Sequence, residues 1–217
     1  NAYARGPLAY ERHFRELGGL IAVSRNPKIK VFVSEWNAQS TDWRTGLYAA
    51  GLLNAFERAG DVVTMASPAL WLRHVSATAW DNAFINFDHC TWFPAPNYVV
   101  MKLWRDHAAP NLIAIEGDAK GLNAAAVKTD DGSRIFFKAV NPGAEAIEVA
   151  LSVKGGAPDA AEFLLVAPGE LSARNTLEEP SKIAPAPAEV RRDGNVLRFT
   201  KPPRSAGVVA LSAPANS

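Results

Sequence analysis

Apolar residues follow two different spacings in the first half of the chain. Residues 7–25 place them at helical intervals, and this pattern predicts a helix. The run KVFVS at 30–34 reads instead as a short buried strand. Further along, we expect helices at 42–60 and 96–107, a strand at 61–67 and a third apolar run at 83–88. Helices that alternate with short apolar strands indicate βα units around a parallel sheet.

From about residue 110 the pattern changes to short strands separated by turn signals. Asp-Gly pairs at 131–132 and 193–194 are typical of hairpins. Regular short strands with Gly and Pro turns indicate a β-sandwich. The Pro-rich stretch 178–190 lies inside this region, so we expect an ordered surface loop there. The expected strands are RIFFKAV (134–140), IEVALSV (147–153), VLRFT (196–200) and GVVALSA (207–213).

These patterns divide the chain into two expected domains. Residues 1–109 contain the βα units, and residues 110–217 form the β-sandwich. With 48% hydrophobic and 21% charged residues among 217, the composition is that of a globular protein able to bury a core. The chain opens on Asn1 without an initiator Met or a signal-like segment, so we expect it to be part of a longer polypeptide. Its compartment, cytoplasmic or secreted, stays open.

Charge and metal-ligand spacing restrict the classes of partner. A net charge of +1 gives no electrostatic basis for binding nucleic acid or an acidic membrane surface. No apolar run approaches the roughly 18 residues of a membrane span. The single cysteine, Cys90, excludes an intrachain disulfide and a Cys-rich zinc site, and the four His lack metal-ligand spacing. We therefore expect no metal, no other cofactor, no nucleic acid and no membrane.

Candidate chemistry appears where the strand at 30–34 ends. Glu35 follows the strand directly, with Trp36 and Asn37 behind it. The C-terminal ends of strands carry the chemistry of a β/α barrel. A carboxylate at such a position is costly unless water or hydrogen bonds compensate it. Glu35 is therefore a candidate catalytic group, and a structural ion pair with an Arg is its alternative role.

The segment VFVSEWN, with the helix and strand after it, resembles glycoside hydrolase family 51, which comprises α-L-arabinofuranosidases and some endoglucanases. Further segments are similar to that family in the same order: 83–107, 171–190 and 199–211. The resemblance covers roughly residues 20 to 215. It implies an α/β plus all-β fold, in which the C-terminal part of a (β/α)8 barrel precedes a β-sandwich.

The resemblance implies that Glu35 is the nucleophile of a retaining glycosidase. Such an enzyme uses two carboxyl groups about 5–5.5 Å apart. The family's acid/base Glu follows an Asn on an earlier barrel strand, and no Asn-Glu pair occurs in these 217 residues. We therefore expect the chain alone to be incomplete, with the missing barrel segment in the same or another chain. The opening Asn-Ala-Tyr resembles a motif that ends barrel strand six, which makes Tyr3 a candidate sugar contact.

Other candidates for substrate binding surround these motifs. Asn37 could contact sugar hydroxyls or cap its loop. Trp36 lies on the opposite face of a strand from Glu35, which favours core packing. Asp88 and His89 alternate faces, so both cannot point into one site. Asp88 is the favoured sugar contact because the matching family position is polar, and His89 and Trp92 fit a structural role equally well.

The resemblance breaks down at one aromatic position. The family often has a second aromatic shortly after Glu-Trp-Asn, whereas this chain has Ala38 and Gln39, and its next aromatic is Trp43. The expected reaction is release of arabinofuranosyl residues from plant polysaccharides or oligosaccharides. The departure leaves room for a family member that cleaves β-glucan.

A non-catalytic alternative treats residues 110–217 as a carbohydrate-binding or packing module. That region contains neither Trp nor Tyr, which favours structural support over sugar binding. Members of the family are often homo-oligomers, so the resemblance also leaves a homo-oligomer open.

Overall fold

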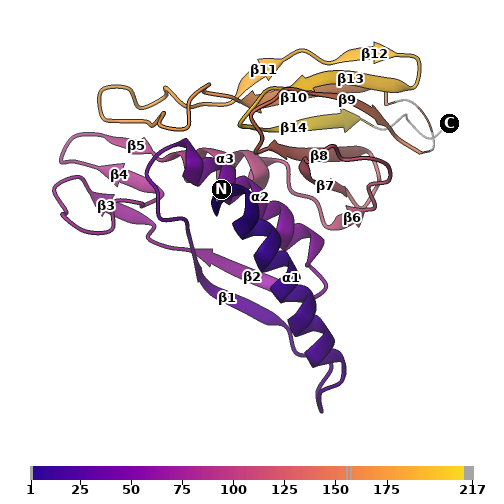
Figure 1. Ribbon diagram of the computed structural model, residues 1–217, viewed down its shortest axis with the longest axis horizontal. Helices are drawn as coiled ribbons and strands as arrows, with labels where there is room; N and C mark the ends of the chain where they lie inside the picture. The colour runs from indigo at the N-terminus through magenta and orange to yellow at the C-terminus, as the bar shows by residue number, and fades with distance from the viewer. Residues whose placement is uncertain (1, 155, 157, 213–217) are drawn as a thin grey trace.

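The computed structural model describes residues 2–154, 156 and 158–212 (Figure 1). Its helices are α1 (Ala2–Ala22), α2 (Trp43–Arg58) and α3 (Pro96–Asp106). The strands of the first half are β1 (Val31–Trp36), β2 (Val63–Pro68), β3 (Leu72–His74), β4 (Ile85–Phe87) and β5 (Trp92–Pro94). Those of the second half are β6 (Asn111–Ile113), β7 (Asn123–Lys128), β8 (Arg134–Asn141), β9 (Ile147–Ser152), β10 (Ala160–Val166), β11 (Ala186–Ala188), β12 (Arg191–Asp193), β13 (Val196–Lys201) and β14 (Ser205–Ser212). None of the described helices is long and apolar enough to cross a membrane.

Strands β1 and β2 form a parallel pair connected through α2, which is the βα arrangement expected from the sequence. Helix α2 begins where the Asp42 carboxylate accepts a hydrogen bond from the Arg44 amide at 3.0 Å, an N-cap. Phe14 of α1 packs with Ala59, at the end of α2, and with Val63 of β2. Helices α1 and α2 together cover one face of the strand pair (Figure 1).

The second half of the chain builds a β-sandwich. A six-stranded sheet in the order β11-β10-β14-β8-β7-β6 faces a three-stranded sheet in the order β12-β13-β9 (Figure 1). Phe137, Phe163 and Phe199 contribute to the apolar layer between the two sheets. The four predicted strands correspond to β8, β9, β13 and β14, although residue 213 of the last one lies outside the described residues. Both Asp-Gly pairs lie at hairpin turns.

The other face of the six-stranded sheet packs against α2 and α3. Trp43 and Val100 from the helices share one apolar cluster with Phe136 and Val208 from the sheet. Lys138 of β8 and Glu57 of α2 form an ion pair within this contact. Burial lowers the pKa of Lys138 and raises that of Glu57, while their mutual attraction opposes both shifts. The helices and the sandwich are therefore joined by a continuous core.

Helix α1 begins earlier than the sequence predicts. The predicted helix starts at Pro7, whereas α1 runs from Ala2 with Pro7 inside it. Pro7 is buried against Gly51 of α2, where an added Cβ would lie 2.9 Å from the Pro7 ring. This packing compensates for the helical hydrogen bond that proline cannot make. The likeness of residues 1–3 to the end of a barrel strand is wrong for Ala2 and Tyr3, which are helical, and Asn1 lies outside the described residues.

Strands β3, β4 and β5 form a small sheet of their own, which we call the side sheet. Strand β3 pairs parallel with β4, and β4 pairs antiparallel with β5. Of the apolar run at 83–88, only Ile85–Phe87 is a strand, and it pairs here rather than with β1 or β2. Figure 1 shows the side sheet extending from the molecule beyond the C-terminal ends of β1 and β2.

Candidate active site

Glu35 lies at an irregularity of β1 that sets its direction. Val33 pairs with Ala66 of β2, and Trp36 pairs with Pro68. Three residue steps on β1 therefore match two on β2, which is a β-bulge. Strict alternation would place Glu35 on the same face as Val33. With the extra residue, Val33 and Trp36 both pack toward the helices, and Glu35 is exposed on the opposite face.

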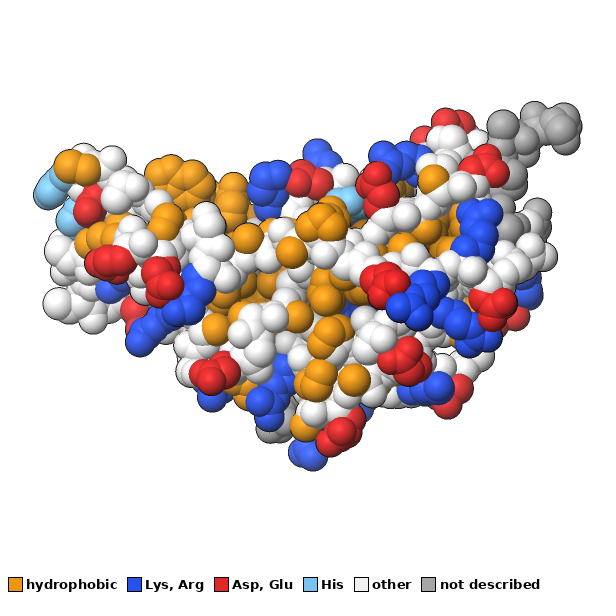
Figure 2. Space-filling model, turned by 90° about the horizontal axis from the view of Figure 1, so that it is seen from above, with side chains coloured by type: hydrophobic (Ala, Val, Ile, Leu, Met, Phe, Trp, Pro, Cys, Tyr) orange, Lys and Arg blue, Asp and Glu red, His pale blue; other side chains and the backbone are white. Residues whose placement is uncertain are grey.

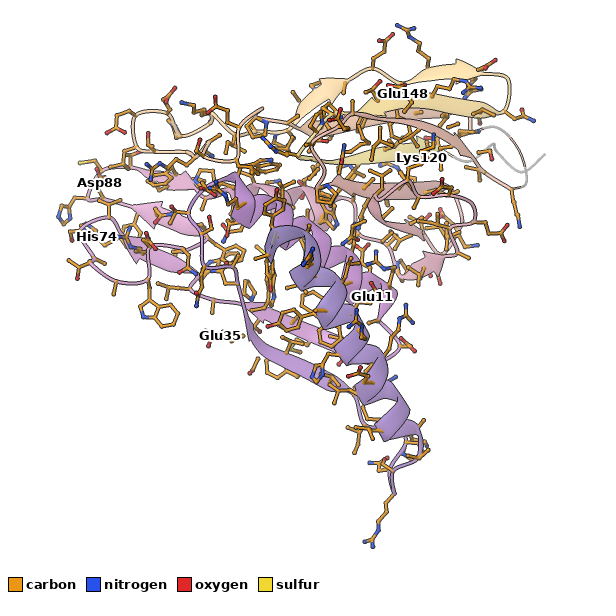
Figure 3. All side chains as sticks on the ribbon, in the orientation of Figure 1. Glu11, Glu35, His74, Asp88, Lys120 and Glu148 are labelled. Atoms are coloured by element: carbon orange, nitrogen blue, oxygen red, sulfur yellow. The ribbon has the colours of Figure 1, made fainter. Side chains whose placement is uncertain are left out.

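The face of the β1–β2 pair that carries Glu35 is open. Phe32 and Met65 are partners in the parallel register and remain 55% and 59% exposed, although both are large and apolar. Among the described residues, the Glu35 carboxylate has no hydrogen-bond or ion-pair partner. Figure 3 shows Glu35 at the end of β1, on the side of the molecule away from the sandwich. The carboxylate is therefore accessible to a ligand that approaches this face.

Trp36, by contrast, lies in the core. Its indole contacts the rings of Phe84 and Phe56, with centroids 5.5 Å and 5.8 Å away. Its Nε1 is buried without a hydrogen-bond partner in the described part of the chain. This burial favours the packing role of Trp36 over the sugar contact also considered for it.

The side chain of Asn37 joins three segments around the end of β1. Its Nδ2 donates to the carbonyl oxygen of Asn82 at 2.8 Å. Its Oδ1 accepts from the Ala38 amide at 2.7 Å and from Asn97 Nδ2 at 3.1 Å. Asn82 in turn donates to the Ala38 carbonyl at 2.7 Å. Asn37 therefore ties the loop after β1 to the β3–β4 loop and to the first turn of α3.

Asp88 shapes the turn between β4 and β5. Its carboxylate accepts hydrogen bonds from the amides of Cys90 and Thr91, at 2.8 Å and 2.7 Å. These two backbone bonds lower the pKa of Asp88 below its usual value. The interactions are those of a turn-forming Asp, and they engage one carboxylate oxygen.

His89 and Trp92 lie near Asp88 at the outer end of the side sheet. The His89 ring lies 4.9 Å from that of His74, and Trp92 of β5 pairs with Phe87 of β4. Figure 3 shows His74 and Asp88 far along the side sheet from Glu35. The structure therefore groups Asp88, His89 and Trp92 with one another and not with Glu35. Within the described ranges, no cluster of three or more His, Cys, Asp and Glu is arranged to hold a metal ion.

Tyr3 and Trp43 belong to the contact between the helices and the sandwich. Tyr3, in the first turn of α1, packs against the apolar cluster that contains Trp43. Trp43 is fully buried, its amide donates to the Ala173 carbonyl at 2.8 Å, and its indole donates to the Arg204 carbonyl at 2.6 Å. Trp43 thus anchors the sandwich at the start of α2 and has no open ring face for a sugar.

Asn175 is a structural residue that the sequence analysis did not single out. It belongs to the loop between β10 and β11, and its Nδ2 donates to the carbonyls of Pro94 and Ile183 at 3.0 Å and 3.1 Å. Its Oδ1 accepts from the Ile183 amide at 2.6 Å. The only sequence signal was its place in Asn-Thr-Leu-Glu-Glu-Pro, one of the family-like segments. These bonds order the loop and fasten it to the side sheet.

Known proteins similar in sequence match most of the chain. Alpha-L-arabinofuranosidase 1 of Arabidopsis thaliana is 26% identical over 190 residues, which cover 81% of this chain and 28% of that protein. Alpha-L-arabinofuranosidase A of Aspergillus niger is 21% identical over 192 residues, which cover 86% of this chain and 30% of that protein. The chain therefore spans less than a third of the length of these curated relatives.

Solved structures share the fold. The thermostable GH51 alpha-L-arabinofuranosidase from Thermotoga petrophila superposes with a TM-score of 0.81 at 21% identity, covering 95% of this chain and 49% of that one. The alpha-L-arabinofuranosidase from Thermotoga maritima gives 0.82 at 20% identity, covering 96% and 49%. This likeness confirms the expected fold class, barrel units followed by a β-sandwich.

A family model gives the assignment. The model described as the alpha-L-arabinofuranosidase C-terminal domain matches residues 26–205, which include Glu35 and the sandwich as far as the start of β14. The chain belongs to this family, and the resemblance to glycoside hydrolase family 51 drawn from the sequence is confirmed.

Proposed function

We propose that the protein containing this chain is a retaining glycoside hydrolase that releases α-L-arabinofuranosyl residues from plant polysaccharides or oligosaccharides. The observation that carries the proposal is the placement of Glu35. A bulge at the C-terminal end of β1 turns this one carboxylate onto the open face of the strand pair. The names of the relatives, which are alpha-L-arabinofuranosidases, indicate which sugar is released.

The proposed reaction has two displacements at the anomeric carbon. In the first, a Glu35 carboxylate oxygen attacks that carbon while a second carboxylic acid protonates the departing glycosidic oxygen. The bond to the leaving group breaks and a glycosyl–Glu35 ester forms. In the second, the acid, now a carboxylate, takes a proton from water, and the water oxygen displaces Glu35. The sugar leaves with its original anomeric configuration.

We expect the second carboxyl group to come from outside these residues. The resemblance implies an acid/base Glu directly after an Asn, and the 217 residues contain no Asn-Glu pair. The exposed Phe32 and Met65 beside Glu35 suit coverage by further barrel strands, because open apolar sheet faces favour association. We infer that the rest of the barrel supplies both the cover and the acid/base residue.

Replacement of Glu35 by Gln in the complete protein tests the proposal. The amide is nearly the same size but is a poor nucleophile, so turnover of an aryl α-L-arabinofuranoside should fall by at least about 1,000-fold. A fluorinated arabinofuranoside should label wild type on Glu35, detected as a peptide mass shift, and should not label E35Q. Glu148→Gln is the matched control, because Glu148 is an exposed glutamate on β9, distant from Glu35 in Figure 3.

Wild-type turnover by E35Q would refute the assignment of the nucleophile. A protein that hydrolyses a soluble β-glucan and leaves the arabinofuranoside intact would instead be the β-glucan-cleaving member considered above. Retention of the complete protein on a polysaccharide column, with no hydrolysis of that polysaccharide, would support the non-catalytic alternative.

A further inference from the structure

The two indoles that follow Glu35 in the sequence are both committed to the core. Trp36 packs against Phe84 and Phe56, and Trp43 is buried with its indole bonded to the Arg204 carbonyl. Neither has a ring face open to a ligand. An aromatic surface for a sugar beside Glu35 must therefore come from another segment of the chain.

Trp80, in the loop between β3 and β4, has the properties that the buried indoles lack. Its side chain is 65% exposed, in a loop whose neighbouring residues are polar or small. Its backbone has φ of +59°, a left-handed conformation that is unfavourable for residues with a bulky side chain. Such strain persists where the surrounding structure imposes it, and it gathers at functional sites. An exposed indole on a strained backbone contributes little to the stability of the fold, and this favours a role in binding for Trp80.

Hydrogen bonds connect the Trp80 loop to the segment that follows Glu35. Asn82 accepts from the Asn37 side chain at 2.8 Å and donates to the Ala38 carbonyl at 2.7 Å. Trp80 and Asn82 are two residues apart, as are Glu35 and Asn37, and two residues span at most about 7 Å. The distance from Trp80 to Glu35 is therefore no greater than the length of a few linked sugar rings.

We propose that Trp80 is a specificity-determining residue that stacks on a sugar ring of the leaving-group side of the substrate. The proposal rests on the proposed function and adds the class of substrate, an oligosaccharide or polysaccharide with at least one ring beyond the scissile bond. The face of an indole is large, apolar and rigid, and it matches the face of a sugar ring that carries C–H groups. Asp81 and Asn82 next to it offer hydrogen-bonding groups for the hydroxyls at the ring edge.

The test compares two substrates in the complete protein, an arabinose-substituted xylo-oligosaccharide and methyl α-L-arabinofuranoside, which has no leaving-group ring. Trp80→Gly should lower kcat/KM for the oligosaccharide about tenfold, mainly through KM, and change that for the methyl glycoside less than twofold. Trp80→Phe should retain most of the activity on the oligosaccharide, because it keeps a ring. Glycine suits the left-handed backbone, so W80G should unfold no earlier than wild type.

Lys120→Gly provides the matched control. Lys120 also has a positive φ, of +49°, but it lies in the sandwich part of the molecule, far from Glu35 in Figure 3. K120G should relieve the same kind of backbone strain and leave both kcat/KM values unchanged. An equal loss on both substrates in W80G, or no loss on the oligosaccharide, would overturn the role of Trp80.

A binding measurement separates this proposal from the proposed function. Titration calorimetry of the xylo-oligosaccharide and of a β-glucan oligosaccharide against E35Q and E35Q/W80G does not depend on turnover. A dissociation constant about tenfold weaker in the double variant for either ligand supports the stacking role, even if wild type hydrolyses no arabinofuranoside. Unchanged constants for both ligands would reject it. A lower melting temperature of W80G would show that Trp80 contributes to the stability of the fold and would overturn its role as a stacking surface.

Discussion

At the scale of single residues, the bulge in β1 reconciles two conflicting requirements. The strand packs Val33 and Trp36 against the helices, and a carboxylate between them cannot be buried without partners. A regular two-residue period would place Glu35 on the face of Val33. The extra residue lets the strand return Trp36 to the core after Glu35 has been exposed. The geometry that makes Glu35 a candidate nucleophile is thus also the one that keeps the strand stable.

Lys201, unlike Glu35, is an ionisable residue that stays buried. It is fully buried, its Nζ lies 5.5 Å from the centre of the Phe163 ring, and that nitrogen has no hydrogen-bond partner among the residues that the structure describes. Burial lowers the pKa of Lys201 to about 7. The unfolded chain keeps this pKa near its ordinary value of about 10.4, so the unfolded state binds more protons between the two values. The free energy of unfolding should therefore rise as the pH increases from about 7 to about 10.

We expect Lys201→Met to raise the free energy of unfolding by about 2 kcal/mol near pH 7, because it removes a buried amine that lacks a polar partner. The gain should shrink toward pH 10, because the lysine of the unfolded chain then also begins to lose its proton and keeping Lys201 neutral in the folded state costs little. Chemical denaturation at both pH values measures the difference. Lys182→Met, at a half-exposed lysine paired with Glu179, is the control and should change stability little at either pH. A gain that is equal at both pH values would refute the explanation.

At the scale of elements, the sequence predicted those whose periodicity is strong and missed those that depend on neighbours. Helix α2 and strand β1 were predicted from their apolar residues, whereas the Asp42 cap that begins α2 was found only in the structure. Strand β7 contains three consecutive Ala, which favour helix, and becomes a strand because it pairs with β8 over a buried face. Three-residue edge strands such as β3 and β12 are too short to show a period.

In the candidate site, too, the sequence predicted some features and missed others. Glu35 could be found from the sequence because a carboxylate at the end of an apolar run is visible there. The exposure of Trp80 and its positive φ are tertiary properties, so no local pattern gives them. The separation of Asp88 from Glu35 follows from the side sheet, whose pairing no periodicity indicated.

Helix α1 is held to its neighbours by one ion-pair network. The Glu11 carboxylate accepts two hydrogen bonds from Arg58 of α2, at 3.0 Å and 2.5 Å, and one from Arg15 at 2.9 Å. Arg58 also donates to the Ala124 carbonyl of β7 at 2.6 Å. Burial alone would raise the pKa of Glu11, but the two arginines hold it below its usual value. The Arg58 side chain thus links the two helices to strand β7 of the sandwich.

Glu11→Gln should therefore lower the free energy of unfolding by about 1–2 kcal/mol at neutral pH. A depressed carboxyl pKa contributes stability above the ordinary value of about 4.3, and this contribution is lost as the pH falls through the lower folded value. The difference between E11Q and wild type should accordingly shrink as the pH falls below about 4.3, as measured by thermal unfolding across the acid range. Glu16→Gln, at an exposed glutamate on the same helix, should match wild type throughout. A deficit of E11Q that persists unchanged in acid would contradict the ion-pair explanation.

At the scale of the whole molecule, the βα units and the β-sandwich share one core. Figure 2 shows apolar side chains gathered in the centre of the upper face, between charged residues. Inside, the six-stranded sheet is covered on one side by β9, β12 and β13 and on the other by α2 and α3. We propose the two expected domains as units of architecture that depend on each other for stability.

Residues 110–217 expressed alone should therefore fold poorly. Removal of the helices exposes the apolar face of the six-stranded sheet, including Phe136 and Val208, to water. We expect this fragment to bind a hydrophobic dye and to unfold at a clearly lower temperature than residues 1–217, with a broad transition.

The variant Phe136→Ser/Val208→Ser should improve the solubility of the fragment and destabilise residues 1–217, because the same surface is exposed in one and buried in the other. A fragment that is monomeric, free of dye binding and as heat-stable as residues 1–217 would show that the sandwich is an independent domain. In that case the cluster shared with α2 and α3 would act as a docking surface between two domains.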